Sequence, residues 1–317
     1  MAGRPNLFII GAMKSGTTSL HNYLDMHPEI AMSEEKEPGY FVEELALKRG
    51  ENWYASLFEP DTQYRYRGES STHYTKLPLY RGVAERIFEF APDARLIYVM
   101  RDPFERAVSH YWHAVRDVHH GGELRRMIKA VTEQPSDYLA FSDYAMQLEP
   151  YVELFGREAI FTLTFESLVR DPQQEIDRIF AWLGLPGHSI GEHSSKAHNQ
   201  KPENMVGVAG AGILNRIQYS GMWDRISPLV PNRFKEWARR LAYKKVDEAD
   251  STAELETLRS LIADIQQRQI ESLSRLLNRD FPEWGKTART TRACSGSASQ
   301  RGRAAMSAPY PVSVPPQ

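Results

Sequence analysis

Short apolar runs alternate with amphipathic segments along the chain. Residues 7–10, 94–100 and 159–165 are runs of aliphatic, β-branched and aromatic side chains, a pattern typical of strands buried on both faces of a sheet. Between and after these runs, apolar residues recur with helical spacing. The predicted helices span residues 17–26, 103–115, 173–185 and 253–277, with a shorter helix over 53–58 and a further strand over 63–70.

The segment "RDPFERAVSHYWHAV" gives the clearest helical signal. Asp102 is suited to cap the helix and Pro103 to begin it. Apolar side chains then recur at i, i+3, i+4, i+7, i+8 and i+11 from Phe104. Because strands alternate with such helices, we predict an α/β fold in which helices cover both faces of a parallel sheet, a three-layer domain. Ligands of such sheets bind beyond the carboxyl ends of the strands. The segments after strands 7–10 and 94–100 therefore meet at one edge if these strands are neighbours.

Composition adds limits to this picture. The chain has 317 residues, 41% of them hydrophobic and 25% charged, as expected of a globular protein with a sizeable core. The net charge is −2, but residues 286–317 contain five basic side chains and no acidic one. The remaining body is therefore acidic, which argues against general binding of nucleic acid. We predict one domain over residues 1–285 and a disordered tail over 286–317, where periodicity is absent.

Cysteine use and hydropathy bear on location. The single cysteine, Cys294, lies in the predicted tail, so no disulfide forms within the chain. The first apolar run is too short for a signal peptide, and no run approaches the roughly 18 apolar residues of a membrane-spanning helix. These features predict a cytoplasmic protein. His110 and His113 lie three residues apart on a predicted helix, but no carboxylate has zinc-site spacing around them, and we expect no metal.

The stretch "GAMKSGTTSL", residues 11–20, joins the first strand to the first helix. A glycine-containing turn there presents consecutive backbone N–H groups to an anion, with the helix dipole behind them. Gly11 and Gly16 have the spacing of a nucleotide-binding P-loop, but Thr17 stands where that loop has lysine. Lys14 instead lies within the loop. There its ammonium can reach an atom beyond the bound phosphate, such as the bridging oxygen of a group being transferred.

This stretch resembles the 5′-phosphosulfate loop of sulfotransferases that use 3′-phosphoadenosine 5′-phosphosulfate (PAPS), whose hydroxyl-rich "KSGTT" form is specific. The resemblance extends over residues 6–284, is closest to the heparan-type and bacterial carbohydrate branch, and implies a P-loop-type fold with PAPS as co-substrate. It implies that Lys14 contacts the bridging oxygen. The residues that would hold the 5′-phosphate are Lys14, Ser15, Gly16, Thr17, Thr18 and Ser19.

Two later segments extend the resemblance. In "RDPFERAVSHY", Arg101 and Ser109 have the spacing of eight of the family's 3′-phosphate motif, and a guanidinium can bind a phosphate through two hydrogen bonds. In "KEPGYF", Glu37 matches the family's catalytic base. In "KAHNQKPEN", Lys201 would reach a phosphate from a segment that covers the nucleotide. Finally, Ser70 stands where some heparan sulfotransferases have a lysine. His73 follows it, and it either helps to bind the acceptor or is simply a residue at the rim of the site.

The sequence thus predicts transfer of a sulfuryl group from PAPS to a hydroxyl or amine, on a carbohydrate or glycolipid by resemblance or on another small molecule. Glu37 would accept the acceptor's proton and Lys14 would stabilise the leaving oxygen. Two alternatives stay open: a P-loop kinase or NTPase that uses ATP and Mg²⁺, and a non-catalytic protein that binds the same nucleotide. The sequence leaves the oligomeric state open.

Overall fold

A parallel five-stranded sheet forms the centre of the computed structural model, which describes residues 4–58, 64–116, 124–133, 136–191, 205–207, 243–245 and 248–285. The strand order is β2-β3-β1-β4-β5, and every neighbouring pair is parallel. The strands span Ile30–Met32 (β2), Tyr66–Ser70 (β3), Leu7–Gly11 (β1), Arg95–Met100 (β4) and Ile160–Thr164 (β5). The predicted α/β fold with a central parallel sheet is confirmed.

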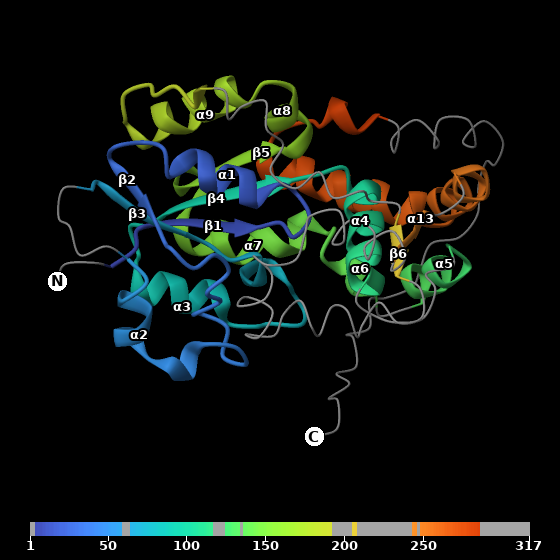
Figure 1. The fold of residues 1–317 in the computed structure, drawn as a ribbon, viewed down its shortest axis with the longest axis horizontal. Helices are drawn as coiled ribbons and strands as arrows, with labels where there is room; N and C mark the ends of the chain where they lie inside the picture. Colours follow the sequence, from blue (N-terminus) through green and yellow to red (C-terminus); the bar gives the residue numbers. More distant parts are fainter. Residues whose placement is uncertain are drawn as a thin grey trace, which may run out of the picture.

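Helices cover both faces of this sheet (Figure 1). On one face α1 (Thr17–Leu24) and α9 (Pro172–Leu183) bury apolar side chains against β1 and β4. On the other face lie α2 (Glu51–Ala55), α3 (Val83–Phe90) and α7 (Tyr144–Phe155), together with the end of α13 (Glu248–Leu277) and η6 (Pro282–Trp284). The three-layer arrangement therefore matches the prediction.

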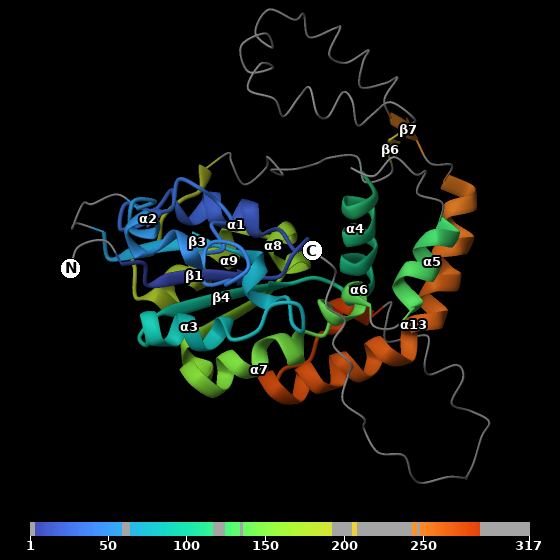
Figure 2. The same ribbon diagram turned by 90° about the horizontal axis from the view of Figure 1, so that it is seen from below.

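A group of helices lies beside the sheet rather than over it (Figure 2). Here α4 (Pro103–Arg116), α5 (Leu124–Thr132), α6 (Asp137–Ala140) and α13 share a smaller apolar core that includes Phe104, Tyr111 and Leu258. The remaining elements are η1 (Leu47–Arg49), η2 (Thr72–Thr75), η3 (Arg157–Ala159), α8 (Phe165–Arg170) and an antiparallel pair, β6 (Met205–Gly207) with β7 (Tyr243–Lys245).

Several predicted boundaries were wrong. The first helix ends at Leu24 rather than residue 26, because the chain turns before Pro28. The third strand ends at Thr164, whose hydroxyl caps α8, so Phe165 is helical and not part of the strand. The last helix begins at Glu248, five residues before the predicted start. Residues 286–317 lie outside the described part of the chain, and the domain boundary at 285 stays a prediction.

Candidate active site

The carboxyl ends of β1, β3, β4 and β5 lie at one edge of the sheet because these four strands are adjacent and parallel. β1 and β4 are direct neighbours, with Leu7 opposite Arg95 and Ile9 opposite Ile97. The first and second predicted strands are therefore neighbours, as the prediction of a shared ligand-binding edge required. Four segments follow these strand ends, and together they form the candidate site: residues 12–16, 71–76, 101–102 and 165–166.

The loop after β1 is tightly packed and needs both of its glycines. A Cβ on Gly11 would clash with the hydroxyl of Thr75 and come within 2.6 Å of the Tyr98 ring. Gly16 has φ +88° and ψ +15°, the left-handed conformation that favours glycine, and precedes α1. Lys14 also has a positive φ, +69°. The loop therefore turns sharply into the first turn of the helix.

The inner surface of this loop is suited to an anion. Among the described residues, the N–H groups of Gly16, Thr17 and Thr18 have no acceptor. The Ser15 side chain is fully buried, and its hydroxyl has no hydrogen-bond partner there. Buried polar groups are normally hydrogen-bonded, so donors left without acceptors at a helix N-terminus fit an anionic ligand such as a phosphate. This observation supports the prediction that the loop after β1 binds an anion.

Arg101 lies directly beside the loop. Its Nη1 is 3.5 Å from the carbonyl oxygen of Lys14, a long and weak contact that nevertheless brings the two predicted anion-binding elements together. The backbone of Arg101 is held by Tyr144, whose hydroxyl accepts from the Arg101 N–H at 3.2 Å and donates to its carbonyl at 2.7 Å. Sequence reasoning missed Tyr144, because no motif links it to Arg101, 43 residues earlier. Ser109 is buried on α4, the helix that begins just after Arg101.

Glu37 lies across the site, beside the end of β3. Its backbone has φ +62°, outside the right-handed helical region that Pro38 is expected to disfavour, and its N–H donates to the Ser70 carbonyl at 2.8 Å. The Oε2 atom accepts from the backbone N–H and the hydroxyl of Thr72, at 2.7 and 3.0 Å. His73 Nδ1 is 3.4 Å from the same oxygen. The segment 71–76 thus fixes the carboxylate from the opposite side.

The charge of Glu37 is set by its neighbours. Burial by itself would raise the pKa of this carboxyl, but contact with His73, the Lys36 ammonium and the Thr72 N–H outweigh it and lower the pKa to about 2. Lys36 Nζ is 2.6 Å from Oε1. Glu37 is therefore ionised at neutral pH, as a proton acceptor must be, while its partners keep it weakly basic. Stronger basicity requires Lys36 to leave Oε1.

Basic groups are concentrated around the carboxylate and Lys14. Burial lowers the pKa of Lys76, which the Glu37 carboxylate raises in part. The Lys76 ammonium makes no hydrogen bond or ion pair with any described residue. Burial also lowers the pKa of His110 to about 3, with further lowering by Arg106, Lys76 and Lys14. Arg106 itself is fully buried. This positive environment suits a ligand that carries several negative charges.

Glu69 is a second carboxyl that the sequence did not single out. It is fully buried at the end of β3, and its Oε1 accepts hydrogen bonds from Tyr54 at 2.8 Å and from Tyr74. Burial raises its pKa to about 7, against the lowering effect of the two tyrosine hydroxyls. Because Glu69 is fully buried against tyrosines of the apolar core, it supports the turn that holds Glu37 rather than meeting a ligand.

A family model described as "Sulfotransferase domain" matches residues 4–206 of this chain. The chain belongs to the sulfotransferase domain family. The resemblance predicted from the motifs is therefore confirmed at the level of the family. A solved sulfotransferase from Alicyclobacillus acidocaldarius has a TM-score of 0.61 and 26% identity, and the match covers 89% of this chain and 99% of that one.

Curated relatives match over shorter stretches. Human heparan sulfate glucosamine 3-O-sulfotransferase 6 is 28% identical over 185 residues, 57% of this sulfotransferase-family chain and 52% of the human protein. The membrane-associated sulfotransferase kil1 of Dictyostelium discoideum is 40% identical over 115 residues, 35% of this chain and 23% of that protein. The chain thus spans about half or less of the length of these relatives.

Some predictions stay untested. Lys201 lies outside the described residues. No helix in the described ranges has the length and apolar character that crossing a bilayer requires. The cytoplasmic location, the lack of a role for metal and the lack of nucleic-acid binding all stay predictions.

Proposed function

We propose that this chain transfers the sulfuryl group of PAPS to a hydroxyl or amine of a carbohydrate acceptor. The observation that carries the proposal is the loop after β1, directly beside Arg101, whose N–H donors and buried Ser15 hydroxyl have no acceptor among the described residues. Adenosine 3′,5′-bisphosphate (PAP), the product left by PAPS, has two phosphates that need two such elements. The ionised Glu37 on the other side of the site supplies a proton acceptor.

In the proposed reaction each residue acts on one part of the donor. The loop from Lys14 to Ser19 holds the 5′-phosphate, and Arg101 with Ser109 holds the 3′-phosphate. The acceptor oxygen or nitrogen forms a bond to sulfur while the bond from sulfur to the bridging oxygen breaks. The acceptor's proton passes to Glu37, and the Lys14 ammonium stabilises the negative charge that develops on the bridging oxygen. The products are PAP and the sulfated acceptor.

Lys36 and His73 would tune the proton acceptor. Because Lys36 Nζ is 2.6 Å from Glu37 Oε1, an acceptor hydroxyl must displace the ammonium before it can donate to that oxygen. Displacement removes an opposite charge and raises the basicity of the carboxylate when the acceptor is in place. The N–H and hydroxyl of Thr72, which donate to Oε2, keep the carboxylate oriented meanwhile, with His73 3.4 Å from the same oxygen.

The carbohydrate acceptor is proposed from the relatives. Several curated relatives carry heparan sulfate glucosamine in their names, and they match more than half of this chain. Ser70 replaces a lysine of some heparan sulfotransferases, so the charge pattern of the acceptor is not carried over from those relatives. Lys76, whose ammonium has no partner in the described part of the chain, is a candidate to meet an acceptor group beside Glu37. Lys201 is proposed to reach a phosphate.

Two measurements test the proposal. Calorimetric titration with PAP and with ATP–Mg²⁺ should show binding of PAP alone; tighter binding of ATP–Mg²⁺ would favour the kinase alternative. Incubation with labelled PAPS and glucosamine-containing oligosaccharides should give labelled products. Lys14→Ala should abolish turnover, whereas Lys48→Ala, which removes an exposed lysine from η1, should not. Equal activity of the two variants would contradict the role of Lys14, and PAP binding without transfer would favour the non-catalytic alternative.

A further inference from the structure

Phe165 and Glu166 follow the end of β5, a place that no motif in the sequence marks as part of the site. β5 pairs with β4 in parallel, and Met100 lies opposite Thr164. Because the two strands end in register, the residues that follow them also lie side by side. Phe165 and Glu166 are therefore adjacent to Arg101 and Asp102, where the 3′-phosphate is proposed to bind.

The ring of Phe165 touches both proposed phosphate-binding elements. A Cβ on Gly16 would come within 2.8 Å of the Phe165 Cδ2 atom, so the ring lies directly against the loop after β1. The Arg101 guanidinium carbon is 5.0 Å from the centroid of the same ring, within the range of a cation–π contact. One side chain therefore sets the separation between the loop and the guanidinium.

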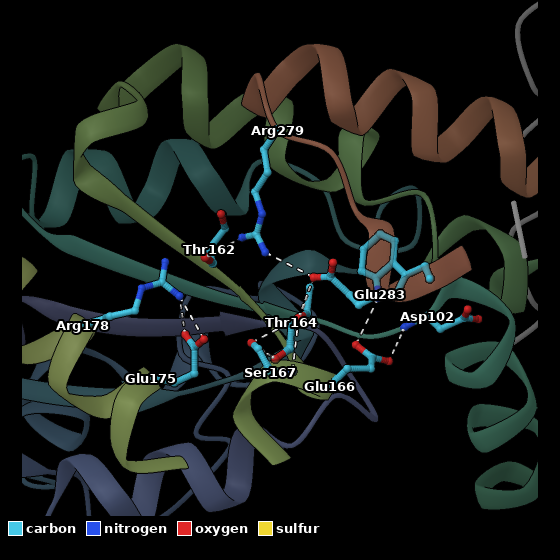
Figure 3. A network of polar contacts seen from close by, with 10 residues as sticks. Asp102, Thr162, Thr164, Glu166, Ser167, Glu175, Arg178, Arg279 and Glu283 are labelled. Carbon is cyan, nitrogen blue, oxygen red and sulfur yellow. Dashed lines mark hydrogen bonds and ion pairs between the residues drawn. The ribbon is translucent and has the colours of Figure 1, made fainter. Parts of the chain in front are cut away.

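The carboxylate of Glu166 fixes the backbone next to Arg101 (Figure 3). Its Oε1 accepts from the Asp102 N–H at 2.9 Å, and its Oε2 accepts from Trp284 Nε1 at 3.1 Å. Hydrogen bonds to an ionised acceptor are stronger than those between neutral groups. The carboxylate thus joins the turn after β4 to η6, near the end of the described chain.

The far side of this bridge is itself anchored. Trp284 is buried, and its ring stacks on Phe281 with centroids 4.4 Å apart. The Thr164 hydroxyl lies 3.0 Å from Glu283 Oε1, which also receives Arg279 Nη2 at 3.3 Å. Glu166 therefore links the backbone of Asp102 to this anchored segment. The Asp102 side chain in turn caps α4 by accepting from the N–H groups of Phe104 and Glu105.

We propose that Phe165 and Glu166 are positioning residues for the nucleotide: Phe165 sets the distance between the two phosphate-binding elements, and Glu166 aims Arg101 at the 3′-phosphate. This inference rests on the proposed function. Neither residue needs to touch the reacting atoms. Glutamine at position 166 keeps the shape but has one acceptor oxygen, so it satisfies either the Asp102 N–H or the Trp284 N–H and not both.

The test compares two nucleotides that differ only in the 3′-phosphate, PAP and adenosine 5′-phosphate, by calorimetry on the full chain. Glu166→Gln should bind PAP about tenfold more weakly, equivalent to about 1.4 kcal/mol, and should change its affinity for adenosine 5′-phosphate less than about twofold. Phe165→Leu should weaken the binding of both nucleotides, because the ring also supports the loop proposed to hold the 5′-phosphate.

Two controls match these variants. Glu175 is a buried carboxylate on α9 that pairs with Arg178 at 2.7 and 2.9 Å and touches neither phosphate element. Phe161 lies on β5 and packs against Trp182 instead. Glu175→Gln and Phe161→Leu should leave both affinities within about twofold of the original chain, whatever they do to the melting temperature.

The outcomes distinguish a failure of the proposed function from a failure of the positioning role alone. If the original chain binds PAP no better than adenosine 5′-phosphate, the proposed function fails and this inference fails with it. If the original chain prefers PAP and Glu166→Gln keeps that preference, or loses affinity for both nucleotides equally, the positioning role of Glu166 alone is overturned. If Glu166→Gln does not fold, Phe165→Leu decides, and affinities equal to those of Phe161→Leu overturn the inference.

Discussion

Gly16→Ala is the substitution whose effect can be worked out most fully from the structure. Gly16 has φ +88° and ψ +15°, so an L-residue there adopts a left-handed conformation that costs about 1–2 kcal/mol. The new methyl group would also come within 2.8 Å of Phe165 Cδ2 and 3.1 Å of Cε2. Overpacking of this kind costs about 1–3 kcal/mol. The two costs sum to about 2–5 kcal/mol of lost unfolding free energy.

Gly82 provides a matched control. It has φ +70° and ψ +13° and precedes α3, an eight-residue helix like α1. A Cβ there would meet Arg86 Nη1 at 2.8 Å, the far end of a flexible side chain that can move aside. Gly82→Ala should therefore cost about 1–2 kcal/mol, from the backbone alone. The difference between the two variants isolates the contact with Phe165.

The assay is urea-induced unfolding of both variants, followed by calorimetry with PAP. We expect Gly16→Ala to be the less stable variant and to bind PAP more weakly, because displacing the Phe165 ring disturbs the loop and Arg101 together. Gly82→Ala should bind PAP normally. Equal destabilisation by the two substitutions, or unchanged PAP affinity in Gly16→Ala, would refute the proposal that the ring sets the distance between the two proposed phosphate-binding elements.

Three other predictions concern charge and capping. Asp102→Ala and Asp171→Ala each remove a helix cap and should each cost about 1 kcal/mol of stability, but only the first should weaken PAP in calorimetry. Burial raises the Glu69 pKa from 4.5 to about 7, so its stabilising contribution is complete below pH 4.5 and lost as the pH rises through 7. Glu69→Gln should abolish this loss of about 3 kcal/mol in unfolding free energy, measured by denaturation at pH values from 4.5 to above 7. An unchanged dependence of the unfolding free energy on pH would contradict the prediction. Lys36→Met should raise the lowered pKa of Glu37 and move the acid limb of the rate profile to higher pH; a limb that stays in place would show that another group titrates.

The sequence was most informative where structure depends on local periodicity. The strands predicted over 7–10 and 94–100 are present, as Leu7–Gly11 and Arg95–Met100. The helix from Pro103 begins at the expected residue with Asp102 as its cap. Such patterns are local, because strand and helix geometry repeat every two and every 3.6 residues. Boundaries were less accurate, as at Thr164, where the hydroxyl of a residue inside the predicted strand caps a helix instead.

The partners of Glu37 illustrate what local pattern does not contain. Its carboxylate is held by Thr72 and His73, 35 and 36 residues later, because η2 follows β3 at the same sheet edge. No spacing rule connects these positions. The resulting pKa of about 2 is likewise a product of contacts between distant segments.

By itself the sequence determined the glycine-rich loop with Lys14, the order of the motifs, the alternation of strands and helices and the resemblance that the family match confirmed. Only the tertiary structure decided that Phe165 and Glu166 lie against Gly16 and Asp102. The physical reason is that strand order is chosen by burial summed over the whole chain. The residues that follow β1, β4 and β5 become neighbours only when those strands pair, whatever distance separates them in the sequence.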